Sequence, residues 1–122
     1  MRDSGETGRR GESLATDYLR RAGFVIVERN WRCGHYEIDI IARKGWVLHF
    51  VEVKTRAAGG WTTPEQAVTA AKSRALMRAA RAYAAMHRCP DDDIQFDLIA
   101  VDMLPDGSYE IRLVENAVEQ GW

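Results

Sequence analysis

Two apolar segments separated by only three residues constrain the fold of this 122-residue chain more than any other feature. Residues 36–42 and 46–54 are rich in Val, Ile and aromatic residues, and Arg43-Lys44-Gly45 lies between them. Such a spacing predicts a β-hairpin. Both faces of the two strands are largely apolar, which is typical of a sheet that is covered on each side.

Periodicity and turn residues predict the remaining elements. Helical spacing covers residues 8–22 and, after a start at Thr62-Thr63-Pro64-Glu65, residues 62–87. Strand patterns cover residues 24–30, 94–103 and 109–115. The predicted order is α-β-β-β-α-β-β, an α/β domain with a mixed β-sheet flanked by helices.

Length and composition predict one domain over residues 1–122, with residues 1–7 as a disordered tail. No apolar run approaches the length of a membrane span, and the N-terminal residues lack the apolar core of a signal peptide. Cys33 and Cys89 have neither CxxC spacing nor the density of a disulfide scaffold. We therefore expect a cytoplasmic protein with reduced thiols and no membrane partner.

The net charge of −1 conceals an uneven distribution. Residues 43–88 hold nine Lys or Arg and two acids, whereas residues 89–122 hold one Arg and nine acids. The asymmetry is compatible with an anionic partner on one face, and also with two halves that attract each other. The pI near 6.3 argues against a protein that coats nucleic acid through charge alone.

Charged residues inside such apolar strands are unusual, and four of them occur here: Glu37, Asp39, Glu52 and Lys54. Glu52 and Lys54 share one face of their strand. With Lys44-Gly45 as a two-residue turn, Arg43 pairs with Trp46, Asp39 lies opposite Phe50, and Asp39 becomes a diagonal neighbour of Glu52. A three-residue turn would place the two carboxylates on opposite faces.

Two carboxylates on one strand pair can hold Mg²⁺, and a lysine ammonium beside them can stabilise or orient the water that attacks a phosphodiester. From the spacing alone, an ion pair without chemistry remains an alternative. Glu12 lies at the edge of the apolar stripe of the first helix, so it can face the sheet. Alternatively, it is a first-turn glutamate that complements the helix dipole. Asp97, between Phe96 and Leu98, is predicted to be a paired buried acid.

The long helix carries a basic stripe formed by Arg74, Arg78, Arg81 and Arg88. The stripe can follow a phosphate backbone or be a solvated face. Lys72 lies on the opposite side of the helix, among apolar residues. Either its stem passes the core to reach solvent, or its ammonium holds a phosphate at the site.

The run Phe50-Val51-Glu52-Val53-Lys54-Thr55-Arg56 resembles the signature of the YraN-like family of uncharacterised bacterial proteins. That family is similar to restriction endonucleases and to archaeal Holliday-junction resolvases. The resemblance extends over nearly the whole chain, through Gly11-Glu12, Ala15, Tyr18-Leu19, Gly23, Asn30, Arg32, Glu37-Ile38-Asp39, Lys72, Phe96-Asp97 and Asn116-Ala117. One departure is Tyr36, where the family usually has glycine.

The resemblance implies a restriction-endonuclease-like fold with a metal site on Asp39, Glu52 and the carbonyl of Val53, assisted by Lys54 and Glu12. It thus implies a Mg²⁺- or Mn²⁺-dependent nuclease that acts on nucleic acid. DNA is favoured over RNA as the substrate, including branched DNA and repair or recombination intermediates. The nucleic-acid-binding residues would be Arg56, Lys72, Arg74, Arg78 and Arg81. A homodimer is a further expectation, because a chain this small rarely spans a duplex alone. The alternatives are a non-catalytic nucleic-acid-binding module with the same fold and a structural domain in which the cluster is an ion-pair network.

Overall fold

The computed structural model describes residues 4–34, 36–57, 70–87 and 94–115. They form helices α1 (Ser4–Arg21) and α2 (Ala70–His87) and strands β1 (Val25–Cys33), β2 (Tyr36–Lys44), β3 (Val47–Ala57), β4 (Ile94–Met103) and β5 (Tyr109–Val114). The predicted α/β class and element order are confirmed. Helix α1 begins at Ser4 rather than at residue 8, and β1 continues to Cys33. Residues 62–69 of the second predicted helix lie outside the described residues.

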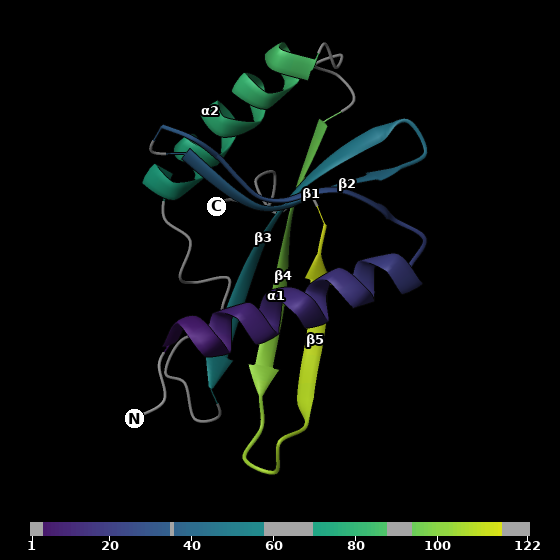
Figure 1. The fold of residues 1–122 in the computed structure, drawn as a ribbon, viewed down its shortest axis with the longest axis vertical. Helices are drawn as coiled ribbons and strands as arrows, with labels where there is room; N and C mark the ends of the chain where they lie inside the picture. The colour runs from purple at the N-terminus through teal and green to yellow at the C-terminus, as the bar shows by residue number, and fades with distance from the viewer. Residues whose placement is uncertain (1–3, 35, 58–69, 88–93, 116–122) are drawn as a thin grey trace.

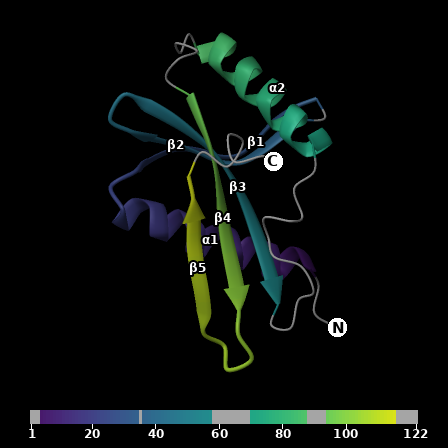
Figure 2. The same ribbon diagram turned by 180° about the vertical axis from the view of Figure 1, so that it is seen from behind.

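The five strands form one sheet in the order β1-β2-β3-β4-β5. Three neighbouring pairs are antiparallel, and β3 pairs with β4 in parallel, so the sheet is mixed as predicted. Helix α1 crosses one face of the sheet and α2 lies against the other (Figure 1), and the view from behind shows the same two layers (Figure 2). In the part of the chain that the structure describes, no helix is both long and apolar enough to cross a membrane.

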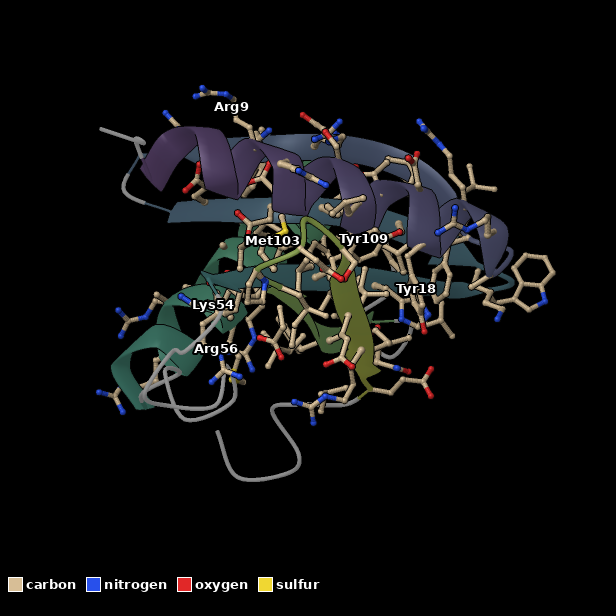
Figure 3. All side chains as sticks on the ribbon, turned by 90° about the horizontal axis from the view of Figure 1, so that it is seen from below. Arg9, Tyr18, Lys54, Arg56, Met103 and Tyr109 are labelled. Carbon is tan, nitrogen blue, oxygen red and sulfur yellow. The ribbon has the colours of Figure 1, made fainter. Side chains whose placement is uncertain are left out.

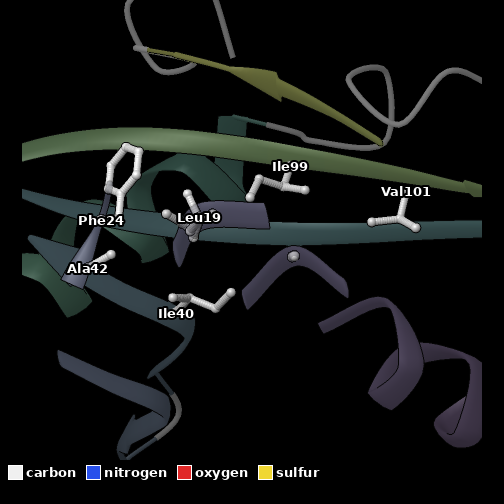
Figure 4. Packing of buried hydrophobic residues seen from close by; sticks show 8 residues of the cluster. Leu19, Phe24, Ile40, Ala42, Ile99 and Val101 are labelled. Carbon is white, nitrogen blue, oxygen red and sulfur yellow. The ribbon is translucent and has the colours of Figure 1, made fainter. Parts of the chain in front are cut away.

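Alternation along the central strands builds a separate core on each face. On one face, Leu19 of α1 packs with Ile40 of β2 and Ile99 of β4 (Figure 4). On the other, Tyr83 of α2 packs with Phe50 of β3. Two apolar faces on the same strands therefore account for the apolar character of both sides of the hairpin.

Gly23 terminates helix α1, and Gly11 lies against β3. The Gly23 amide donates to the Arg20 carbonyl at 3.1 Å and the Phe24 amide to the Leu19 carbonyl at 2.9 Å, with φ of +95° at Gly23. These bonds form a Schellman motif.

Earlier in the helix, a Cβ at Gly11 would overlap the Thr55 side chain, which is β-branched and restricted in its rotation. Glycine at position 11 therefore permits the close contact between α1 and β3.

The turn between β2 and β3 is Gly45-Trp46, so the predicted Lys44-Gly45 turn was wrong. Lys44 pairs with Val47, and Ile41 rather than Asp39 lies opposite Phe50. Gly45 has φ of +62°, and a two-residue turn with glycine in its first position is of type II′. The change moves each pairing by two residues on the partner strand, so the paired residues 40–44 keep their predicted faces.

Candidate active site

The site begins where β2 separates from β3. Strand β2 pairs with β1 from Tyr36 onward, but its pairing with β3 begins only at Ile40, opposite Val51. One step beyond that pair, Asp39 Oδ2 accepts a hydrogen bond from the Val53 amide at 2.8 Å. A side-chain oxygen thus takes the place of the strand carbonyl that the separation removes.

Glu52 and Lys54 lie on β3 beside this fork. The Lys54 Nζ is 3.3 Å from Glu52 Oε2, and the Glu52 side chain is only 6% exposed. Continuing the β2–β3 register by one step brings Glu52 opposite Asp39. Figure 3 shows Lys54 and Arg56 on the side of the sheet away from α1. The register thus brings Asp39 beside Glu52, and Glu52 contacts Lys54 directly.

Negative charge is concentrated at Asp39. Burial and, next, the charge of Glu52 raise the pKa of Asp39 from 3.8 to about 7. The hydrogen bond from the Val53 amide opposes this rise, whereas the charges of Glu12 and Glu37 add to it. In the metal-free protein, the protonated and ionised forms of Asp39 are therefore about equally populated at neutral pH.

Glu12, on α1, acts on the site through its charge. Its charge acts on Asp39, and its Oε1 lies 3.9 Å from Nη2 of Arg29 on β1. The Thr16 hydroxyl donates to the Glu12 carbonyl at 2.7 Å. Because α1 begins at Ser4, Glu12 lies well inside the helix, and the first-turn alternative was wrong. Arg29 was missed, since it lies on another strand and no spacing in the sequence relates it to Glu12.

The donor set suits a hard cation with few protein ligands. Among the described residues, no group of three or more His, Cys, Asp or Glu side chains is arranged to hold a metal ion. Asp39 and Glu52 instead offer two carboxylates, and Val53 offers a backbone carbonyl. Mg²⁺ is commonly bound through one or two carboxylates, with water and substrate phosphate completing its shell. The residues present therefore fit Mg²⁺ or Mn²⁺, which keeps several water ligands, better than a metal ion whose ligands all come from the protein.

The predicted nucleic-acid-binding residues have different surroundings. Arg56 donates from Nε and Nη2 to the carboxylate of Asp102 on β4, at 3.1 and 3.3 Å. Arg74, Arg78 and Arg81 are exposed along α2. The side chains of Lys72 and Tyr36 and the whole of Arg88 lie outside what the structure describes.

Asp97 is fully buried and paired, as the sequence predicts. Its Oδ2 is 2.7 Å from Nδ1 of His49 on β3, and the Gln95 amide donates to its other oxygen at 3.0 Å. The His49 ring in turn meets Phe24 edge-on, with ring centroids 4.8 Å apart. This pair joins β3 to β4 close to Glu52 and supports the strand that carries it.

Comparisons with known proteins place these residues in a wider group. A family model described as "Uncharacterised protein family UPF0102" matches residues 11–101. A UPF0102 protein of Geobacter sulfurreducens is 43% identical, covering 92% of this chain and 88% of that protein. One from Symbiobacterium thermophilum is 44% identical, covering 93% and 97% respectively.

A solved structure is also similar in outline: Archaeoglobus fulgidus Hjc, a Holliday junction resolvase from an archaeal hyperthermophile. It is 20% identical with a TM-score of 0.47, covering 85% of this chain and 74% of that one. At this level the likeness concerns the course of the chain alone.

Proposed function

The chain belongs to the uncharacterised protein family UPF0102, the family that its signature resembles, and we propose that it is a metal-dependent phosphodiesterase acting on nucleic acid. One observation carries the proposal. Asp39, fixed by the Val53 amide, and Glu52, paired with Lys54, meet at a fork between two strands. A purely structural ion pair needs Glu52 and Lys54 alone, whereas the half-buried Asp39 adds a second carboxylate that repels the first.

Each group has a role in the proposed chemistry. A Mg²⁺ or Mn²⁺ ion held by Asp39, Glu52 and the Val53 carbonyl would supply an acidified water and neutralise phosphate charge. The Lys54 ammonium, held by Glu52, would orient the attacking water and stabilise the negative charge that develops on it. Glu12, whose carboxylate lies 3.9 Å from Arg29 and whose charge acts on Asp39, would help to position that water.

The charge and the exposure of the α2 arginines support nucleic acid as the substrate. Arg74, Arg78 and Arg81 form an exposed basic row on α2, which covers the same face of the sheet that carries Lys54. An exposed row of arginines is suited to contacts with successive phosphates. DNA, including branched DNA, is the first substrate to test, and RNA of the same sequence is the comparison.

The ion pairs of Glu52 with Lys54 and of Glu12 with Arg29 favour a competing hypothesis, in which the cluster only holds the strands and α1 together. Removing one partner of a buried ion pair typically costs about 3–5 kcal/mol. A catalytic cluster instead loses activity with little loss of stability. Cleavage and melting must therefore be measured on the same variants.

The decisive experiment is a cleavage assay with Mg²⁺ and Mn²⁺ on linear, flapped, single-stranded and four-way DNA. We expect cleavage by the wild type and none by Asp39→Asn or Lys54→Met, while both variants still bind DNA. Asp106→Asn is the control, because Asp106 is an exposed carboxylate in the β4–β5 turn. Absence of wild-type cleavage on every substrate, with a large loss of stability in both variants, would end the nuclease proposal.

The binding role of α2 has a separate test. Replacing Arg74, Arg78 and Arg81 together by alanine should weaken DNA binding. It should also lower the slope of log affinity against log salt concentration by an amount that corresponds to up to about three phosphate contacts. Arg9→Ala is a control on the other helix, where Arg9 is exposed and points away from the sheet (Figure 3). An unchanged salt slope in the triple variant would make the row a solvated face.

A further inference from the structure

A tryptophan stands in solvent at the tip of the β2–β3 hairpin. Trp46 is the second residue of the turn and is 85% exposed, and Val25, at the start of β1, is 65% exposed. A type II′ turn requires glycine only at its first position, which Gly45 fills. Neither turn geometry nor packing therefore requires an indole at position 46. Because exposed indole surface is unfavourable in water, a bound partner is the natural explanation.

Cations surround this tip. Arg43 and Lys44 precede the turn and are exposed, and Arg20 and Arg21 end α1. The two segments are adjacent: Lys44 Nζ lies 5.0 Å from the centre of the Phe24 ring, and Arg43 pairs with Val25. Figure 1 shows the end of α1 and the β2–β3 turn on the same side of the molecule. We call the set Arg20, Arg21, Arg43, Lys44 and Trp46 the hairpin-tip surface.

Few acids offset this charge. Arg20 lies 3.9 Å from Asp17, a contact between two well-exposed side chains. Among the described residues, neither Arg43 nor Lys44 forms an ion pair with a carboxylate. The hairpin-tip surface thus combines an exposed aromatic ring with a net positive charge.

We infer that the hairpin-tip surface binds an unpaired nucleobase of the substrate strand, with the base stacked on Trp46 and the flanking phosphates on its cations. Aromatic side chains stack on every base, and cations track the backbone beside it. The inference rests on the proposed function, because both sites would hold one polymer. Glu52 is six residues from Trp46 along the chain of β3, which corresponds to about 20 Å. The recognised base therefore lies about that far from the phosphate at the carboxylates.

A second copy of the chain fits this surface less well than a polyanion. A two-fold contact would place the same patch on both partners, so the cations of one copy would face those of the other. Like charges that meet in an interface cost several kcal/mol. A nucleic-acid strand instead brings negative charge and a flat ring together, matching both components of the surface.

The test is metal-free binding of labelled DNA to the full chain, measured by fluorescence anisotropy. A flapped duplex and a fully paired duplex of equal length are compared on the wild type, Trp46→Ala and Trp46→Phe. Met86→Ala is the matched control, because Met86 is a 64% exposed apolar residue on α2. Melting curves verify folding, which an exposed residue should not affect.

We expect Trp46→Ala to weaken binding of the flapped duplex by about 5- to 100-fold, Trp46→Phe by less, and Met86→Ala not at all. Binding of the fully paired duplex should change little. Arg43→Ala should lower the slope of log affinity against log salt concentration for the flapped duplex by an amount that corresponds to about one phosphate contact.

Equal binding of the flapped duplex by Trp46→Ala and by the wild type would overturn the inference and leave the cleavage proposal intact. The same holds if the wild type binds phosphatidylserine vesicles through Trp46 while its DNA binding is independent of Trp46. Conversely, Trp46-dependent binding of flapped DNA without cleavage on any substrate would support this inference and refute the proposed enzyme.

Discussion

Asp39→Asn removes one negative charge from the crowded carboxylates and keeps an oxygen that can accept the Val53 hydrogen bond. In the metal-free protein, the consequence depends on pH. Because the fold raises the pKa of Asp39 from 3.8 to about 7, the folded state binds a proton there more tightly than the unfolded chain does. Below about pH 4 both states are protonated and Asp39 costs no stability. The cost grows as pH rises towards 7 and is complete above it.

The magnitude follows from linkage. Each pKa unit corresponds to about 1.4 kcal/mol, so a rise from 3.8 to about 7 corresponds to at most roughly 4 kcal/mol. Because Asp39 is only half-buried, solvent reduces both its desolvation and its repulsion by Glu52, so we expect about 2 kcal/mol. At about pH 8 the asparagine variant should then melt roughly 8 °C above the wild type, and near pH 4 the two should coincide.

The assay is thermal unfolding in EDTA at several pH values, followed by circular dichroism. Asp106→Asn is the control of opposite sign, because hydrogen bonds from the Ser108 hydroxyl and amide lower the pKa of Asp106. Its charge adds stability that is present at neutral pH and lost as the pH falls through the lowered value. If Asp39→Asn proves less stable than the wild type at about pH 8, or if its effect is independent of pH, the account of a buried Asp39 charge beside Glu52 is refuted.

Three other predictions concern stability. Gly11→Ala should destabilise the protein by about 1–3 kcal/mol in urea titrations, because the new methyl overlaps Thr55; a neutral result would mean that α1 can move away from β3. Asp97→Ala should cost about 1–3 kcal/mol, measured in the same titrations, because the buried His49 ring loses its partner; an unchanged midpoint would show that the pair contributes nothing. At about pH 8, Mg²⁺ should raise the melting temperature of the wild type but not of Asp39→Asn, as calorimetry with and without the ion would show; equal shifts would place the ion elsewhere.

The main parts of the site could be predicted because they depend on the strand period alone. Glu52 and Lys54 are two residues apart on one strand, so their shared face follows for any register. Asp39 required the correct turn length but not the correct turn position. Gly45 suits either of two adjacent two-residue turns, and the apolar Trp46 resembles a strand residue, which explains the misplaced turn.

Other features depend on contacts that no local pattern records. The separation of β2 from β3 at Asp39 arises from the course of two strands, and the sequence of neither strand signals it. The contact of Glu12 with Arg29 joins a helix to an edge strand. The start of α1 at Ser4 was missed because its first turn lacks the apolar periodicity on which the prediction relied.

The placement of the carboxylates within one hairpin has a consequence for folding kinetics. Asp39 and Val53 are fourteen residues apart, whereas the parallel pairing of β3 with β4 joins residues such as Leu48 and Ile94, forty-six apart. Closing the shorter loop costs less entropy, so the hairpin should form first and the parallel ladder later. Substitutions in the hairpin core should then slow folding, and those in β4 should mainly speed unfolding. The residues of the fork would thus be in register before the rest of the sheet has assembled around them.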